Sequence, residues 1–297
     1  MRWLRIGGLI TVSVVPLMIA ASAARHEFRA DFRPDRSVPA RPAILAHEKL
    51  EAVEFEARGN TLRGWFIPSS NGAAVLLLHG ADADRTQLAS EAHLLAQHGF
   101  GVLLFDWPGH GESSGAVTWD AGERAALSAA VDFASRAPGI DAERIGVFAF
   151  SMGTMIAIQV AARDPRVAAL VVEGAFADAD DELRHEYRHW GILSQWPALW
   201  TAHWLGMKSD ELRPVDVIAE IAPRPVLVIA GTADDVVPPA QSRALFDAAR
   251  EPKSWWLVSG ATHRHYADAV GPAYGEKLVG FYGDALVRQR GSSHLTR

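Results

Sequence analysis

Hydrophobic and polar positions follow two alternating patterns between residues 46 and 288. Short, continuous apolar runs are separated by longer segments in which apolar residues recur at helical spacing. Such runs are typical of strands buried on both faces, and their alternation with helices indicates an α/β fold with a mostly parallel central sheet flanked by helices. The expected strands lie at 73–80, 100–107, 144–151, 167–176, 225–231 and 254–260, and the expected helices at 85–98, 119–136, 152–164, 239–249 and 274–288.

A different pattern precedes the first of these runs. Residues 51–70, EAVEFEARGNTLRGWFIPSS, alternate polar and apolar positions on both sides of a turn signal at Gly59-Asn60. This pattern predicts an antiparallel hairpin, which would extend one edge of the sheet.

The first 24 residues differ from the rest of the chain. Arg2 and Arg5 precede an uncharged run from Ile6 to Ala24 that ends in small residues. The run suits either a cleaved export signal or an uncleaved membrane anchor, so we expect an exported domain, periplasmic or extracellular, or a tethered one. Five Arg within residues 25–41 weaken both interpretations, because basic residues at that place oppose translocation. Residues 25–45 are rich in Pro and Arg and resemble a spacer.

Composition limits the remaining possibilities. No internal repeat or second linker divides residues 46–288, which we therefore expect to form one domain followed by a short tail at 289–297. A net charge of −6 argues against nucleic-acid binding, since backbone phosphates require a basic surface. The absence of Cys excludes a thiol nucleophile and thiolate metal ligands, so chemistry must come from Ser, His, Asp, Glu or a cofactor.

Ser151 stands where an expected strand passes directly into an expected helix. The surrounding sequence, Ala149-Phe150-Ser151-Met152-Gly153, is close to the G-x-S-x-G nucleophile elbow, in which a tight turn exposes the Ser hydroxyl above the sheet edge. Ala149 replaces the first Gly and adds one methyl group at a close contact. A Ser at such a turn is also a common helix N-cap, so the motif alone leaves both interpretations open.

Two further residues follow later strands in the order that this chemistry requires. A nucleophilic Ser needs a His to accept its proton and a carboxylate to orient that His. Asp234 comes just after the expected strand at 225–231, and His263 comes just after the next strand. Asp235 and His265 are their local competitors. The order Ser, Asp, His matches the fold class and predicts a triad of Ser151, Asp234 and His263.

Acyl transfer also needs hydrogen-bond donors for the developing oxyanion. The backbone N–H of Met152 follows the nucleophile directly, and a second donor is expected in the loop after an early strand. The strand ending in His79-Gly80 makes the N–H of Ala81 the natural candidate. His79 is interpreted as a residue that orders this loop.

These residues together resemble a known family. LLLHG, FDWPGHGESSG, FAFSMG, GTADDVVP and GATH occur in the order found in α/β-hydrolases of the serine-esterase type, and the chain is similar to the single-domain, BEM46-like group. The resemblance covers residues 46–288 and implies the same triad and oxyanion donors, with no cofactor. It assigns supporting roles to Asp106 and His110. Ala149 and Thr154 depart from the family's small Gly positions, and neither departure removes a catalytic group.

The resemblance also places a cap insert over the active site, at about residues 177–217. This insert contains Trp190, Trp196, Trp200 and Trp204, the last three at helical spacing on a helix expected to begin at Pro197. Such a stripe is typical of a face packed on the core, and in a cap it can also contact substrate. We therefore treat these Trp residues as candidate substrate contacts.

A zinc motif competes for the same insert. His185-Glu186-Tyr187-Arg188-His189 matches H-E-x-x-H, in which two His on one helix face ligate Zn²⁺. No patterned third ligand is evident, because His203 and the acids at 178–182 follow no recognised spacing. We therefore expect no metal, with His185 and His189 on a solvated helix face.

The sequence as a whole predicts a serine hydrolase that cleaves carboxylic esters or thioesters through an acyl-enzyme. The apolar cap favours an apolar acyl or aryl group, which makes a small-molecule ester or a lipid-like ester the expected substrate. A peptidase or amidase with the same triad, and acyl transfer to an alcohol, are alternatives within enzymes. A non-catalytic binding protein of this fold is a further alternative, although it predicts a missing triad residue and none is missing.

Overall fold

The computed structural model describes residues 34, 36–188, 191–204, 207 and 213–288. The expected signal or anchor at 1–24, residues 25–33 and 35 of the expected spacer, Trp190, His189 and the tail at 289–297 therefore lie outside the described residues. Within the described ranges, no helix has both the length and the apolar character needed to cross a membrane.

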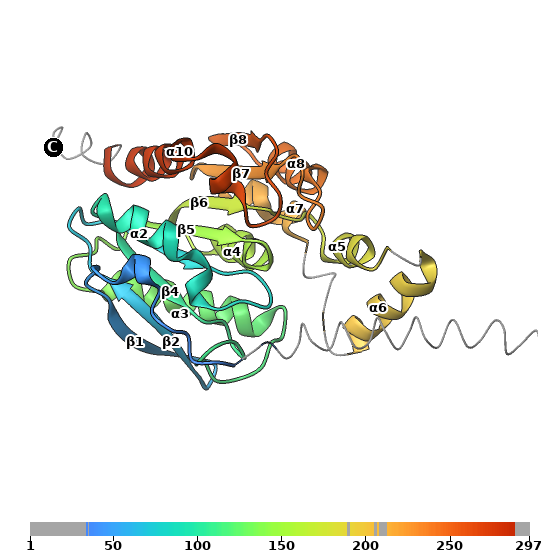
Figure 1. Ribbon diagram of the computed structural model, residues 1–297, viewed down its shortest axis with the longest axis horizontal. Helices are drawn as coiled ribbons and strands as arrows, with labels where there is room; N and C mark the ends of the chain where they lie inside the picture. Colours follow the sequence, from blue (N-terminus) through green and yellow to red (C-terminus); the bar gives the residue numbers. More distant parts are fainter. Residues whose placement is uncertain (1–33, 35, 189–190, 205–206, 208–212, 289–297) are drawn as a thin grey trace, which may run out of the picture.

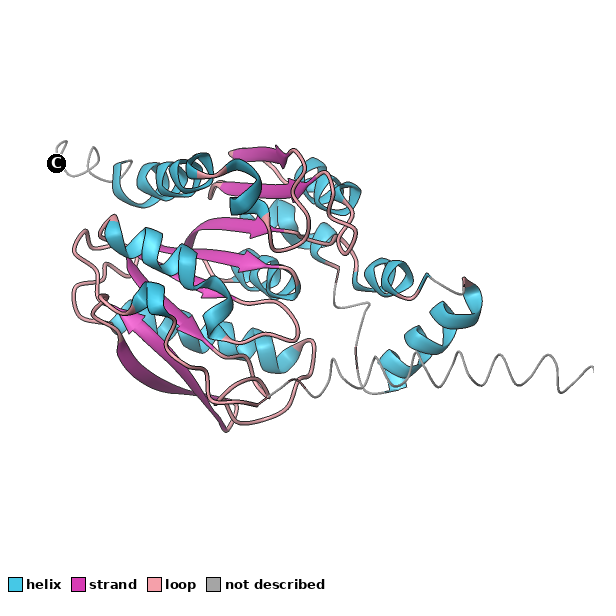
Figure 2. Ribbon diagram, viewed as in Figure 1, coloured by secondary structure: helices cyan, strands magenta, loops and turns pink. Residues whose placement is uncertain are grey.

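An eight-stranded sheet forms the centre of the domain, in the order β1-β2-β4-β3-β5-β6-β7-β8 (Figures 1 and 2). The pairs from β4 through β8 are parallel, and β1 and β2 are antiparallel additions at one edge. The strands are β1 (Glu51–Ala57), β2 (Asn60–Ile67), β3 (Ala74–Leu78), β4 (Gly101–Phe105), β5 (Ile145–Phe150), β6 (Val167–Glu173), β7 (Val226–Gly231) and β8 (Lys253–Val258). The predicted α/β class is thus confirmed.

The antiparallel hairpin is also confirmed, with a small correction at its turn. Ala57 pairs with Asn60, so the two loop residues are Arg58 and Gly59 rather than Gly59 and Asn60. Both have positive φ, at 52° and 79°, which is the backbone that a two-residue hairpin turn requires and that Gly adopts most readily.

Helices cover both faces of the sheet (Figure 2). One apolar cluster joins α3, α4 and α8 to one face, and a second joins α2, α9 and α10 to the other. The helices are η1 (Ala43–Leu45), η2 (Arg85–Leu88), α2 (Ala89–Gln97), α3 (Ala121–Arg136), α4 (Met152–Arg163), α5 (Ala179–Glu186), α6 (Ile192–Trp204), α7 (Pro214–Val217), η4 (Ile218–Ile221), α8 (Pro239–Ala248), α9 (Tyr266–Val270), α10 (Pro272–Tyr282) and the π-helical turn η5 (Gly283–Arg288).

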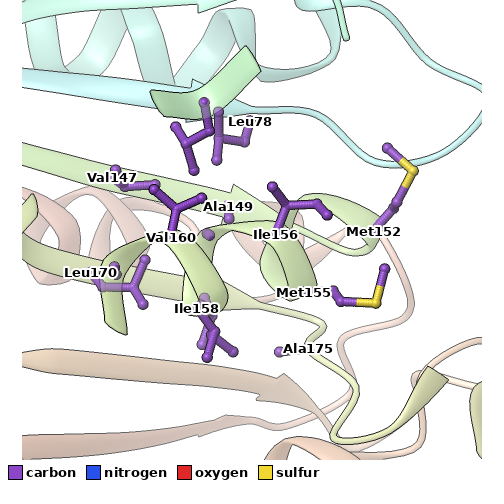
Figure 3. Close-up of a cluster of buried hydrophobic side chains, with 14 of the residues drawn as sticks. Leu78, Val147, Ala149, Met152, Met155, Ile156, Ile158, Val160, Leu170 and Ala175 are labelled. Atoms are coloured by element: carbon purple, nitrogen blue, oxygen red, sulfur yellow. The ribbon is translucent and has the colours of Figure 1, made fainter. Parts of the chain in front are cut away.

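Helix α4 is the best buried of these elements, and it carries the candidate nucleophile at its start. Ten of its residues are buried, and Figure 3 shows Ile156 and Val160 of α4 facing Val147 and Ala149 of β5. A helix that is apolar on several faces is stable only when neighbouring elements enclose it. This packing fixes the position of the turn between β5 and α4.

The cap consists of α5 and α6, between β6 and α7. Helix α6 begins at Ile192, so Pro197 lies inside it rather than at its start. Proline lacks the N–H that would bond to the preceding turn, but at the sixth residue of a helix this removes only one hydrogen bond. The prediction that α6 begins at Pro197 was therefore wrong, because the helix begins earlier, at Ile192.

Candidate active site

Ser151 occupies a sharp turn between β5 and α4. Its backbone lies at φ 50° and ψ −123°, a region that residues with a side chain rarely adopt. The turn is tight because glycine stands at the crowded positions: a Cβ on Gly153 would come within 2.9 Å of the carbonyl oxygen of Leu78, and one on Gly80 within 3.1 Å of the Ser151 Cβ. The strained turn therefore projects the Ser151 hydroxyl above the carboxyl end of β5.

The two departures from the family pattern are accommodated locally. Ala149 is fully buried in β5, where it pairs with Leu78 on one side and Val172 on the other. The Thr154 hydroxyl donates a hydrogen bond to the Ser151 carbonyl at 2.6 Å. The Thr side chain thus ties the first turn of α4 to the nucleophile's backbone.

The structure brings the three predicted triad side chains together. His263 Nε2 lies 3.1 Å from Ser151 Oγ, and His263 Nδ1 lies 2.8 Å from Asp234 Oδ2. The His263 ring also packs on Phe150, with centroids 4.7 Å apart. The competitors are arranged differently, because His265 pairs with Asp268 at the surface and Asp235 is exposed at the cavity wall, whereas Asp234 is buried.

Asp234 is held by more partners than the sequence indicates. Its Oδ1 accepts the backbone N–H groups of Val236 and Val237, and its Oδ2 accepts the Tyr266 hydroxyl at 2.5 Å. Burial alone would raise the pKa of Asp234, but the hydrogen bonds from His263 and Tyr266 lower it below its ordinary value. The carboxylate is therefore ionised and fixed beside the imidazole. Sequence reasoning missed Tyr266, whose only signal is its place three residues after His263.

The two predicted oxyanion donors face the same space. Ala81 and Met152 both line a cavity of about 530 Å³ beside Ser151 and His263. Met152 is the first residue of α4, so its N–H has no partner within the helix. The Gly80 N–H, next to Ala81, is taken by Gln87 Oε1 at 2.7 Å. Both donors are available to an oxygen atom in the cavity.

The loop residues predicted to support the site are buried behind it. His79 Nε2 accepts the Trp107 backbone N–H at 3.2 Å, and its Nδ1 lies 2.8 Å from the Gly80 carbonyl. Burial lowers the pKa of His79 well below its usual value, and burial also lowers the pKa of His110 to about 4. Both rings are therefore neutral and order the loops around Ala81.

Asp106 organises the neighbouring loop. It accepts the backbone N–H groups of Arg85 and Glu112 at 2.8 and 3.0 Å, and its carboxylate lies 3.3 Å from the Arg85 guanidinium. Both side chains are almost fully buried. Gly111 lies so close to the Asp106 carboxylate that a Cβ at this position would overlap it. Asp106 and Arg85 thus hold the loops after β3 and β4 together.

The cavity wall differs from the one that the cap sequence predicted. Trp196, Trp200 and Trp204 are 64–70% exposed and do not line the cavity, and Trp190 lies outside the described residues. Helix α6 packs on α5 through a buried face that includes the small residues Ala198 and Ala202, and its three described Trp side chains point away. The cap side of the cavity is formed instead by α5 and Met207. The lining combines apolar side chains with charged ones: Trp119, Met152, Met155, Phe176, Leu183, Met207 and Val236 with Asp82, Glu182, Glu186, Asp235 and Arg264.

Glu182 is the most perturbed acid in this wall. Burial, and then the nearby Glu186 and Asp234, raise its pKa to about 8, and its Oε2 has no hydrogen-bond partner among the described residues. The folded-state pKa therefore lies above the ordinary value of 4.5. The folded chain keeps this proton at pH values where the unfolded chain has lost it, so stability falls as the pH rises toward 8.

Replacing Glu182 with Gln, which resembles the neutral acid, is expected to leave stability unchanged at pH 5. At pH 9 the variant should be more stable than the wild type by about 1 kcal/mol or more. This free energy is smaller than the full pKa shift would give, because solvent screens the partly exposed side chain. Thermal unfolding at the two pH values measures the difference. Glu276→Gln, on the exposed face of α10, serves as control. Equal stability of the Glu182 variant and the wild type at pH 9 would contradict a raised pKa.

The zinc motif is not assembled into a cluster in the described ranges. His185 lies on α5 with its Nε2 2.9 Å from the Asp235 carbonyl, and His189 is outside the described residues. Among the residues that are described, no group of three or more His, Asp or Glu is arranged to hold a metal ion.

Comparison with known proteins identifies similar chains. A family model described as alpha/beta hydrolase fold matches residues 73–196. The uncharacterized protein Rv2307c of Mycobacterium tuberculosis is 32% identical over 232 residues, which are 76% of this chain and 76% of that protein. The uncharacterized protein YfhR of Escherichia coli is 28% identical over 246 residues, covering 80% of this chain and 81% of YfhR.

Solved structures share the fold at lower sequence identity. The Pyrococcus furiosus esterase Pf2001 superposes with a TM-score of 0.73 at 20% identity, covering 86% of this chain and 98% of the esterase. A Mycobacterium tuberculosis puromycin-hydrolyzing peptidase gives a TM-score of 0.68 at 20% identity, covering 82% of this chain and 40% of the peptidase. These similarities concern the arrangement of strands and helices.

Proposed function

Because this chain belongs to the alpha/beta hydrolase family, we propose that it is a serine hydrolase that cleaves carboxylic esters or thioesters. The observation that most supports the proposal is the continuous line of hydrogen bonds from Ser151 Oγ through His263 to Asp234, at 3.1 and 2.8 Å, beside an open cavity. Nucleophile, base and orienting carboxylate stand in the geometry that acyl transfer requires.

The proposed reaction proceeds in two steps. His263 Nε2 takes the proton of Ser151 as Oγ attacks the substrate carbonyl, while Asp234 stabilises the imidazolium through Nδ1–H. The N–H groups of Ala81 and Met152 hold the oxyanion. His263 then passes its proton to the leaving alcohol or thiol, and a water activated by the same imidazole releases the acid from Ser151.

The cavity lining supports an uncharged, apolar acyl or aryl group. Met152, Met155, Phe176 and Leu183 offer apolar contacts. Asp82, Glu186 and Asp235 outnumber Arg264 in the same wall, and this excess of negative charge would disfavour an anionic substrate. This support comes from the cavity itself rather than from the cap Trp residues. The uncharged run at residues 6–24 supports the further proposal that the domain is exported or tethered to a membrane.

Covalent labelling of the full chain with a fluorophosphonate probe tests the proposal. The wild type should be labelled, because an activated Ser attacks phosphorus, and Ser151→Ala should abolish the labelling completely. A metal chelator should change neither result. Heat-denatured wild type controls for non-specific reaction. No labelling of the folded wild type would defeat the proposal, and labelling that persists in Ser151→Ala would assign the reaction to another residue.

A further inference from the structure

Helix α6 has two faces of different character. Its inner face, which packs on α5, is buried and includes Ala198, Leu199 and Ala202. Its outer face carries Ile192, Trp196, Trp200 and Trp204, each four residues after the previous one, with exposed fractions of 68, 70, 70 and 64%. Figure 1 shows α6 at the far side of α5 from the sheet, at one end of the molecule. These four side chains are called the tryptophan face below.

The tryptophan face is unusual for a helix surrounded by water. A surface helix normally directs charged and polar residues away from the core, whereas α6 is apolar on its outer side too. Two of its rings lie side by side, because Trp200 and Trp204 stack with centroids 6.5 Å apart and an interplanar angle of 7°. Exposed apolar patches of this kind mark interaction surfaces.

The chemistry of the face favours a lipid surface. Tryptophan concentrates at the boundary between water and lipid, where the ring lies among apolar groups and the indole N–H reaches polar ones. Three Trp and one Ile in a single row form the apolar side of an interfacial helix, which lies in the plane of the membrane surface rather than crossing it.

The place where the chain enters the fold provides a second, independent argument. Arg36 Nη2 donates hydrogen bonds to the carbonyls of Ser113 and Gly115 at 2.7 and 3.3 Å, in the loop that follows β4. That loop lies at the carboxyl edge of the parallel strands, the edge from which the cap also extends. The sequence before Arg36 contains the uncharged run at 6–24, which is long enough to enter a bilayer.

We propose that the tryptophan face of α6 docks the domain on the surface of a phospholipid bilayer. Arg36 and the tryptophan face lie toward the same edge of the sheet, so both observations favour one membrane surface at that edge. Helix α5, which lies against α6, forms part of the cavity wall, so docking brings the cavity close to the lipids. The nearness of the cavity to the membrane makes lipid esters the favoured substrates. This conclusion about the substrate rests on the proposed function, whereas the docking itself does not.

Fluorescence of the full chain on vesicles tests the docking. Wild type and a Trp196→Ser, Trp200→Ser, Trp204→Ser variant are bound to vesicles of phosphatidylcholine and phosphatidylglycerol, with and without bromine on the acyl chains. The wild-type emission minus that of the variant reports the three indoles alone. We expect brominated lipid to reduce this difference emission about twofold or more, because interfacial indoles lie within reach of the bromine. Leu257→Ser, which removes an exposed apolar side chain from β8, should leave the quenching unchanged.

Each alternative outcome has a distinct reading. Difference emission that is equal on brominated and ordinary lipid would overturn the proposal. A wild-type dimer that the triple substitution dissociates, together with unquenched difference emission, would assign the face to a second copy of the chain. Fluorophosphonate labelling of the triple variant in the absence of lipid, equal to that of the wild type, establishes that the fold is intact. Loss of labelling in both proteins would defeat the proposed hydrolase while leaving the quenching result valid.

Discussion

Alanine in place of His263 is expected to lower kcat for ester hydrolysis by about 10⁴-fold or more. Without the imidazole, the Ser151 hydroxyl keeps its proton, and the leaving group has no acid to protonate it. The oxyanion donors Ala81 and Met152 and the cavity remain, so binding should change far less than turnover. Steady-state kinetics with a chromogenic ester of an uncharged aliphatic acid separates kcat from KM.

A matched control lies two residues away. His265 is exposed and paired with Asp268 at 2.8 Å, so His265→Ala should keep kcat within about twofold of the wild type. The same comparison applies to Asp234→Asn against Asp235→Asn, in which only the first removes the partner of His263 Nδ1. A His263→Ala enzyme with nearly wild-type turnover would exclude His263 as the base.

Methionine in place of Arg85 is expected to destabilise the domain by about 3–5 kcal/mol, the usual effect of removing one partner of a buried ion pair. Arg85 is 3% exposed, and it contacts the fully buried Asp106, the Glu112 carboxylate and the Trp65 ring, whose centroid is 4.5 Å from the guanidinium. The substitution leaves the Asp106 charge without compensation. Urea unfolding at pH 7 measures the loss.

The pH dependence gives this prediction a second check. Burial already raises the pKa of Asp106 to about 6, although Arg85 opposes the shift. Without Arg85 the pKa should rise further, so the folded variant holds the proton to higher pH and its deficit in stability should shrink as the pH falls toward 5. Arg63→Met is the control, because its pair with Glu54 is exposed and should contribute less than about 1 kcal/mol. A deficit that is the same at pH 5 and pH 8 would rule out the charge on Asp106 as its cause.

The elements that the sequence predicted well are those whose residues face a single environment. β3, β4 and β5 are buried on both faces along their whole length, and a continuous apolar run has few other interpretations. Ser151, Asp234 and His263 could be grouped as candidates because each lies at, or in the loop after, the end of a predicted strand, namely β5, β7 and β8. Parallel strands bring their carboxyl ends to one edge, so the order along the chain was enough to group the three residues.

The cap was predicted less well because its helices face several environments at once. The spacing of Trp196, Trp200 and Trp204 defines one helix face, but it does not specify whether core, substrate or solvent lies opposite. Glu182 shows the converse problem. It belongs to a charged segment, which by composition indicates a solvated helix, and only the packing of α5 over the cavity partly buries it. Tyr266 likewise acquires its role from a contact with Asp234 that no spacing rule predicts.

The hairpin that extends the sheet also determines how the molecule meets its neighbours in solution. β1 is the last strand on its side, so its outer backbone groups are free to pair with a strand from another chain. Glu51, Glu54 and Glu56 are exposed along it, with Glu54 and Glu56 on one face and Glu51 on the other, and a second copy approaching this edge would bring further carboxylates against them. The alternation that fixes the register of the hairpin thus also opposes aggregation through the sheet edge.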